Sequence, residues 1–306
     1  MDYKNQITVS CLGSVYYGSK LEEVKLAIES LLDSVEKPEE IIIVIDGEIN
    51  HQIMSYLRES QKNSLIKLIY STKNIGLGPA LNLGLEKCKC DLICRFDTDD
   101  ISVSERIRIS KEAFQKNSHL DIFGASIVEF IESDENFVKC NIKSSPLNDS
   151  LIKSALDYRN TINHPTVVFK KSSIENLGNY ENIRFFEDYH LWLKARKKDL
   201  IFANTSIPLV LMKRINHSER RQGIDYAKYE LKFFRKSMQQ KLLNPRSFVI
   251  FLVRILTRLI PSKYQIIYFL MPWRGNQKRC LNPIYMRNFS LKNLKIIDKS
   301  NKKNSI

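Results

Sequence analysis

The chain of 306 residues predicts an α/β fold, in which helices flank a mostly parallel, twisted sheet. Two observations support this prediction. Apolar runs typical of strands alternate with amphipathic segments through the first third of the chain. The run Glu40–Ile45 is continuously apolar after its first residue, as in a strand covered on both faces. Parallel strands joined by helices place their carboxyl ends at one edge, where we expect ligands to bind.

The predicted elements follow one another closely. Strands are expected over four apolar runs: Ile7–Cys11, Glu40–Ile45, Ile66–Tyr70 and Asp91–Cys94. A loop is expected from Leu12 to Gly18. The helices between the strands are expected to start at Ser19 and stop at Pro38, to end near Lys62, and to run from Pro79 to Lys87. A further helix, Ser104–Lys116, precedes two strands, Asp121–Phe130 and Phe137–Ile142.

The fourth strand leads into the acidic stretch Asp97-Thr98-Asp99-Asp100. Carboxylates crowded at a strand end repel one another unless a cation lies among them, and Mg²⁺ or Mn²⁺ prefers such oxygen ligands. Asp97 and Asp99 are therefore candidate metal ligands. The alternative is a solvated acidic turn before the next helix, since Ser102 and Glu105 have the spacing of a capping box.

The other predicted strand ends supply Tyr16, Asp46 and Asn74, which makes a nucleotide pocket at this edge plausible. The loop Gly76-Leu77-Gly78 is not a dinucleotide fingerprint, because it lacks the third glycine and follows the third strand. The lysine motif of P-loop nucleotide triphosphatases is also absent. These facts argue against a Rossmann dehydrogenase and a nucleotide triphosphatase.

Glu187 and Asp188 stand at the start of a predicted helix with an apolar face. They favour a helix N-terminus through the helix dipole, or one of them serves as a partly buried general base with a raised pKa. The residues alone leave both readings open. His164, which precedes Pro165, is expected in a structural turn close to the site. Arg221, next to Arg220, is either a clamp for a diphosphate or an exposed basic loop residue.

Taken together, these segments resemble glycosyltransferase family 2, the inverting nucleotide-sugar enzymes of the GT-A fold. Within that family the resemblance is to bacterial capsular, exopolysaccharide and O-antigen transferases. It extends from about Ile7 to Gly223. Four strings carry it: Asn74–Asn82, Asp97–Ser102, Asn163–Thr166 and Phe186–Tyr189.

The resemblance implies roles for the site residues. Ser14, Tyr16 and Asp46 would hold the base and ribose of a nucleotide-sugar donor, UDP- or dTDP-linked. Asp97 and Asp99 would hold Mn²⁺ or Mg²⁺ at the diphosphate. Asp188 would take the proton of the acceptor hydroxyl, supported by Glu187. The remaining residues assigned to the donor side are Asn74, Gly76, Arg106 and Arg221.

Three departures from the family pattern qualify these roles. Ile45 stands where the family often has a second acid before Asp46, and Ser104 replaces a usual proline. The Gln-x-x-Arg-Trp motif of processive synthases is missing. Together with the lack of channel-forming apolar segments, this favours transfer of one sugar per encounter.

The C-terminal part differs in charge. Residues 241–306 contain 14 Lys and Arg against one acid, Asp298, while residues 1–240 are nearly neutral. We predict a catalytic domain over 1–222 and a basic, helical, membrane-surface segment over 223–306. Within it, Ser247–Leu270 is too interrupted by charge to span a bilayer and resembles an interfacial helix. Its expected apolar face consists of Phe248, Phe251, Leu252, Ile255 and Leu259, opposite Arg254 and Arg258. The alternative is a helical appendage packed on the core.

The scattered cysteines suggest reduced thiols, and no signal peptide is evident. We therefore expect a cytoplasmic enzyme that is peripheral on the inner face of the plasma membrane. Its expected partners are a nucleotide sugar, a lipid-linked saccharide acceptor and an anionic membrane surface, with no nucleic acid. Two alternatives remain: a nucleotidyltransferase on a similar sheet, which would leave Glu187 and Asp188 unused, and a nucleic-acid-associated protein that uses the basic tail.

Overall fold

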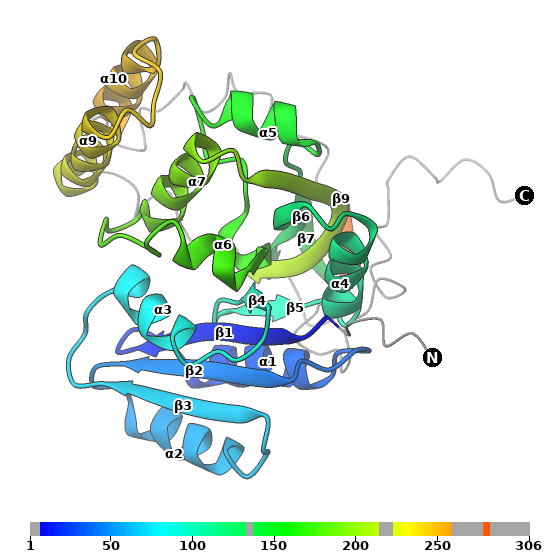
Figure 1. The fold of residues 1–306 in the computed structure, drawn as a ribbon. Coiled ribbons are helices and arrows are strands. Elements are labelled where there is room, and N and C mark those ends of the chain that lie inside the picture. The colour runs from blue at the N-terminus through cyan, green and yellow to red at the C-terminus, as the bar shows by residue number, and fades with distance from the viewer. Residues whose placement is uncertain (1–6, 133–136, 214–222, 259–277, 282–306) are drawn as a thin grey trace, which may run out of the picture.

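The computed structural model describes residues 7–132, 137–213, 223–258 and 278–281. The described residues form a mixed ten-stranded sheet with helices on both faces (Figure 1). Neighbouring strands follow the order β10-β7-β6-β8-β4-β1-β2-β3, and β9 pairs with both β5 and β6. The α/β prediction is confirmed, and the parallel part of the sheet is its N-terminal half.

The parallel half contains the four strands predicted first. They are β1 (Val9–Tyr16), β2 (Glu40–Asp46), β3 (Ile66–Ser71) and β4 (Leu92–Arg95). All three pairings among them are parallel. The predicted loop from Leu12 is wrong as far as Tyr16, because β1 continues alongside β2 until Tyr16 pairs with Asp46. The carboxyl ends of β1 and β2, which carry Tyr16 and Asp46, therefore lie side by side at one edge of the sheet.

The second half of the sheet is largely antiparallel. Its strands are β5 (Asp100–Ser102), β6 (Leu120–Glu132), β7 (Phe137–Lys143), β8 (Val168–Lys170), β9 (Ile201–Lys213) and β10 (Lys278–Leu281). β8 joins the halves, since it pairs antiparallel with both β4 and β6. β5 pairs antiparallel with β9, so the chain gains a different strand neighbour directly after the acidic turn.

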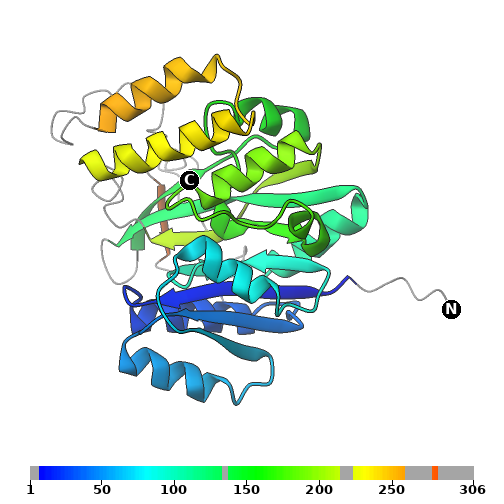
Figure 2. The same ribbon diagram turned by 60° about the vertical axis from the view of Figure 1, so that its left-hand side comes forward.

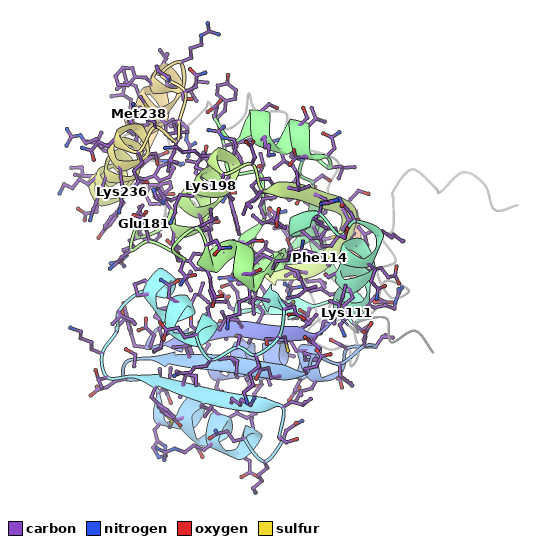
Figure 3. The ribbon with its side chains drawn as sticks, viewed as in Figure 1. Lys111, Phe114, Glu181, Lys198, Lys236 and Met238 are labelled. Carbon is purple, nitrogen blue, oxygen red and sulfur yellow. The ribbon has the colours of Figure 1, made fainter. Side chains whose placement is uncertain are left out.

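The helices bury apolar side chains on the two faces of the sheet. One face is covered by α1 (Leu21–Leu32), α2 (His51–Ser60) and α4 (Arg106–Lys116). The other is covered by α3 (Leu77–Leu85), α5 (Asp149–Ala155), α6 (Lys171–Glu175) and α7 (Glu187–Lys197), with a 3₁₀ turn, η1, at His164–Thr166. Lys111 on α4, visible in Figure 3, is buried and pairs with Glu36 at 2.8 Å.

Two C-terminal helices, α9 (Gly223–Gln239) and α10 (Ser247–Arg258), extend the second of these cores. Figure 2 shows them stacked outside α7. Phe233 of α9 is fully buried and stacks on Phe186, with ring centroids 4.8 Å apart. Lys236 forms an ion pair with Glu181, and both residues are labelled in Figure 3. The described part of the predicted C-terminal segment therefore shares a core with the residues before position 222.

The expected polarity of α10 needs correction. Phe251 is fully buried against Phe233 and Phe234, although it was expected on a lipid-facing side. Arg254 and Arg258 both pair with Glu230 of α9, so they face the protein. Leu259 lies outside the described residues. Among the helices that the structure describes, none combines the length and the apolar character required to cross a bilayer.

Candidate active site

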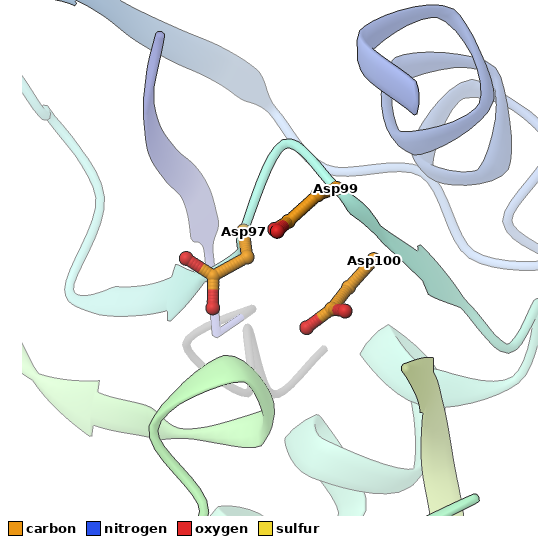
Figure 4. A group of neighbouring side chains, drawn as sticks. All are labelled: Asp97, Asp99 and Asp100. Atoms are coloured by element: carbon orange, nitrogen blue, oxygen red, sulfur yellow. The ribbon is translucent and has the colours of Figure 1, made fainter. Parts of the chain in front are cut away.

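The acidic turn after β4 brings three carboxylates together. Oxygen atoms of Asp97, Asp99 and Asp100 lie within 4.8 Å of one another, and Figure 4 shows their side chains gathered at this turn. Thr98 ties the turn to β1, because its Oγ1 donates to the carbonyl of Ser14 at 3.0 Å. The capping-box alternative is wrong in its register: α4 begins at Arg106, so Glu105 is the N-cap residue and not the third residue of the helix.

The electrostatics of the turn favour a bound cation. Loss of hydration, and then the charge of Asp97, raises the pKa of Asp99 to about 6. Burial and the same neighbours raise the pKa of Asp100 well above its usual range. Such shifts mean that the ionised forms repel one another, while Asp99 remains exposed at the surface of the turn. A cluster of hard oxygen donors with this excess of negative charge fits Mg²⁺ or Mn²⁺.

Two buried arginines hold the acidic turn from the interior of the protein. Arg95 is 2% exposed and binds the Asp97 carboxylate through both terminal nitrogens. Arg106 is also buried and donates to the Ser102 hydroxyl at 2.9 Å and to the Arg95 carbonyl at 2.5 Å. Arg106 was expected to contact the donor. Its burial and its two partners instead make it a brace for the backbone of the turn. The role of Arg95 was not predicted, although it directly precedes the motif.

The ends of β2 and β3 are held together by Asp46. Its buried carboxylate accepts hydrogen bonds from the amides of Ile75 at 2.7 Å and Gly76 at 3.0 Å, and from the Asn74 side chain at 3.0 Å. Gly76 has a φ of 90°, which other residues rarely adopt, so glycine suits this loop. Asp46 was expected to bind the nucleobase; in this structure both of its oxygens hold the loop before α3.

The structure gathers the expected nucleoside-side residues at the carboxyl edge of the parallel strands. Ser14 and Tyr16 lie in the last part of β1, and Tyr16 is in register with Asp46. Both side chains are half-buried, while Asn74 is exposed. Arg221 lies outside the described residues. Thus five of the seven residues expected on the donor side line one edge, and Arg106 lies beneath it.

Glu187 and Asp188 begin α7, as predicted. Burial, and then the charge of Asp188, raises the pKa of Glu187 to about 7. Both carboxylate oxygens of Asp188 accept hydrogen bonds. The Asn160 side chain donates to Oδ2 at 2.7 Å, and the backbone amide of Tyr189 donates to Oδ1 at 2.7 Å. Gly78 permits α3 to pack closely on the segment before this helix, since a Cβ there would lie 3.0 Å from the carbonyl oxygen of Glu181.

Tyr180 lies near both acidic groups. It is buried, and its hydroxyl lies 3.0 Å from Nε2 of His164. Burial raises the pKa of Tyr180, and the charges that act on it include those of Arg95, Asp97, Glu187 and Asp188. The acidic turn and the start of α7 therefore both lie within electrostatic reach of Tyr180. Burial and Arg95 keep His164 neutral by lowering its pKa, which agrees with the structural turn expected there.

Sequence patterns had not indicated Asn160 or Tyr180. Neither belongs to a motif, and they meet Asp188 and His164 from positions 28 and 16 residues away in the chain. Only the packing of the η1 segment against α7 brings these side chains together. The signal for Asp100 was present, since it lies inside the acidic stretch.

Two curated relatives are similar along most of the chain. The amylovoran biosynthesis glycosyltransferase AmsE of Erwinia amylovora is 32% identical over 258 residues, which is 83% of this chain and 95% of that protein. An Escherichia coli UDP-Gal:alpha-D-GlcNAc-diphosphoundecaprenol beta-1,3-galactosyltransferase is 32% identical over 258 residues, which is 84% and 93% of the two chains.

Solved structures with the same fold are more distant in sequence. S. aureus TarS in complex with UDP has a TM-score of 0.57 and 15% identity, covering 86% of this chain and 75% of that one. The mannosyltransferase PcManGT from Pyrobaculum calidifontis, with GDP-Man and Mn²⁺, has a TM-score of 0.54 and 14% identity, covering 77% and 65%. These likenesses establish a GT-A-type fold. A family model described as glycosyl transferase family 2 matches residues 15–178, and with the relatives above it shows that the chain belongs to this family of glycosyltransferases.

Proposed function

We propose that this glycosyltransferase moves one sugar per encounter, with inversion, from a nucleotide sugar to a lipid-linked saccharide in the synthesis of a surface polysaccharide. The observation that carries the proposal is the single site that contains two acidic groups with different surroundings. Asp97, Asp99 and Asp100 crowd together at the strand end. Glu187 and Asp188 begin α7, and the charges of both groups act on Tyr180.

The donor side is assigned to the edge of the parallel strands. Ser14 and Tyr16 would contact the nucleoside, and the loop that Asp46 holds would border it. Asp97 and Asp99 would hold Mn²⁺ or Mg²⁺, with Asp100 near enough to contribute. When bound, the ion would stabilise the negative charge that develops on the departing diphosphate. The donor is assigned as a UDP- or dTDP-sugar, and the UDP-Gal in the name of the E. coli relative supports the first of these.

The acceptor side is assigned to α7. In the proposed step the acceptor oxygen attacks the anomeric carbon as the bond from that carbon to the diphosphate oxygen breaks. Asp188 takes the acceptor proton, and attack from the face opposite the leaving group inverts the configuration. Asn160 and the Tyr189 amide hold the Asp188 carboxylate in one orientation for this transfer. Glu187, with its raised pKa, can carry a proton near neutrality and so limit repulsion beside Asp188.

The proposed acceptor and location follow from the relatives and the charge of the chain. The E. coli relative is named for a diphosphoundecaprenol-linked acceptor, and the E. amylovora relative for the biosynthesis of amylovoran. An acceptor of this kind would be met at the inner face of the plasma membrane, where the basic C-terminal segment would be attracted to anionic lipid.

The test is transfer from a panel of nucleotide sugars to a diphosphoundecaprenol-linked saccharide, with Mn²⁺ or with a chelator. We expect one saccharide product with the inverted anomeric configuration, and we expect it only when the metal is present. Asp188→Asn should lower the transfer rate by a factor on the order of 10² to 10⁴ and retain donor binding, whereas Asp99→Asn should lose both. Equal transfer with the chelator would remove the metal from the mechanism, and a product of retained configuration would contradict the role of Asp188.

A further inference from the structure

The solvent-facing side of α10 exposes several large apolar side chains. Five of its side chains, here called the α10 apolar face, are between 43% and 64% exposed: Phe248, Val249, Leu252, Val253 and Leu256. Their spacing places them along one side of the helix. The helix contains no acidic residue. Figure 2 shows α10 as the outermost layer over α9.

The opposite side of α10 fixes this orientation. Phe251 is fully buried, and its ring lies 5.1 Å from that of Phe234. Arg254 and Arg258 pair with the buried carboxylate of Glu230 at 2.7 Å and 3.3 Å. An internal carboxylate thus draws both positive charges of the helix toward the protein, and the outward side is left apolar.

The α10 apolar face is connected to the catalytic residues by a short series of contacts. Arg254 donates to the carbonyl of Tyr158 at 3.1 Å, and two residues later Asn160 donates to Asp188. The Asn244 amide, just before α10, donates to Asp157 at 3.2 Å. The segment 157–160 therefore lies between α10 and the proposed base. The side chain of Tyr158 is itself exposed.

We propose that the α10 apolar face inserts into the headgroup boundary of an anionic lipid bilayer and so positions the site beside a membrane-bound acceptor. The inference rests on the lipid-linked acceptor of the proposed function. Five exposed basic residues, as an anionic surface requires, lie on α9 or between α9 and α10: Lys228, Lys232, Arg235, Lys241 and Arg246. The 12 described residues of α10 extend about 18 Å, against a hydrocarbon core of roughly 30 Å, and they hold two arginines toward Glu230, so we place them in the plane of the interface.

The experiment compares two double variants of the full chain. Leu252→Ser with Val253→Ser removes exposed apolar groups from α10, and Val35→Ser with Tyr70→Ser removes exposed groups elsewhere. Binding to vesicles of phosphatidylcholine and phosphatidylglycerol is measured by co-sedimentation at low and high salt. Because salt screens the basic tail and not apolar insertion, the α10 variant should lose about tenfold or more of the salt-resistant partition. The control variant should bind as the wild type does.

Several outcomes would overturn the proposal. These are wild-type chain that stays in the supernatant at low salt, α10 and control variants that bind equally, and a wild-type dimer that the α10 substitutions dissociate. The last result would assign the face to a second copy of the chain. Sugar transfer to a diphosphoundecaprenol-linked saccharide is measured on the same preparations. If the wild type transfers no sugar while vesicle binding depends on α10, the proposed function fails and the membrane surface stands.

Discussion

The side-chain amide of Asn160 donates to Oδ2 of Asp188 at 2.7 Å, across 28 residues of sequence. Because the amide of Tyr189 occupies Oδ1, the Asp188 carboxylate is held at both oxygens. These two hydrogen bonds restrict the rotation of the carboxylate. Asn160 is therefore a positioning residue for the proton transfer that we assign to Asp188.

Asn160→Ala should lower kcat by about 10- to 100-fold and leave the KM for the donor unchanged, because it frees the base without touching the nucleotide. Steady-state kinetics with varied donor would measure this. Asn63→Ala, which removes an asparagine that caps a distant turn, is the matched control. Asn160→Asp should move the acid limb of the kcat profile to higher pH, since a like charge favours protonated Asp188. An unchanged profile would mean that Asn160 has only a structural role.

Asp188→Asn should reduce kcat by a factor on the order of 10² to 10⁴, as expected for the loss of a general base. Donor affinity, measured by calorimetry with nucleoside diphosphate and Mn²⁺, should be preserved. Glu187→Gln is the comparison, because it changes the neighbouring carboxyl and keeps Asp188. If the Asp188 variant transferred sugar at the normal rate but lost the nucleotide, the residue would belong to the donor side instead.

Asp99→Asn should remove Mn²⁺-dependent binding of a nucleoside diphosphate, because it takes one charged ligand from the acidic turn. The exposed carboxyl Glu86 supplies the control, Glu86→Gln. The pKa of Asp99 is raised to about 6, so protons compete with the cation below that pH. Calorimetry should therefore show affinity for Mn²⁺ and nucleotide that declines as the pH falls through about 6. Affinity that is constant from pH 5 to 8 would contradict the assignment.

Glu187 should make the metal-free protein less stable as the pH rises. Its pKa is raised from 4.5 to about 7, so the folded state binds this proton more tightly than the unfolded state does. The resulting stability is complete below pH 4.5 and is lost as the pH approaches 7. Between those values, urea titrations should show that Glu187→Gln removes on the order of 2 kcal/mol of the decline in unfolding free energy. The exposed-site variant Glu86→Gln should leave the decline unchanged.

Asp46→Ala should destabilise the protein more than Asn74→Ala does. The first change leaves three donors at the β3–α3 loop without their acceptor, and two of them are backbone amides. The expected loss of unfolding free energy is about 2–3 kcal/mol for Asp46→Ala and about 1 kcal/mol for Asn74→Ala. Donor KM should rise in the Asp46 variant as the loop loosens. Equal stabilities of the two variants would show that the loop does not depend on Asp46.

Much of the parallel half could be predicted from the sequence, because its signals are local. The apolar runs of β2 and β3 end within a residue of their predicted bounds, and Glu187 begins a helix as expected. The carboxyl ends of parallel strands share one edge, so residues that follow these runs were expected to meet there. β1 was predicted too short, since its last residues are held by pairing with β2 and not by their own apolar pattern.

The sequence by itself determined the acidic turn, the strand edge that carries it and the family to which these motifs point. Tertiary structure decided what each charge faces. Arg106 lies beneath the turn, Asp46 holds a loop, Asn160 reaches Asp188, and Glu230 turns Arg254 and Arg258 inward. The reason is physical: a buried charge or amide must find a partner, and that partner comes from whichever distant segment packs beside it. A local pattern records the propensity of a segment and not its neighbours.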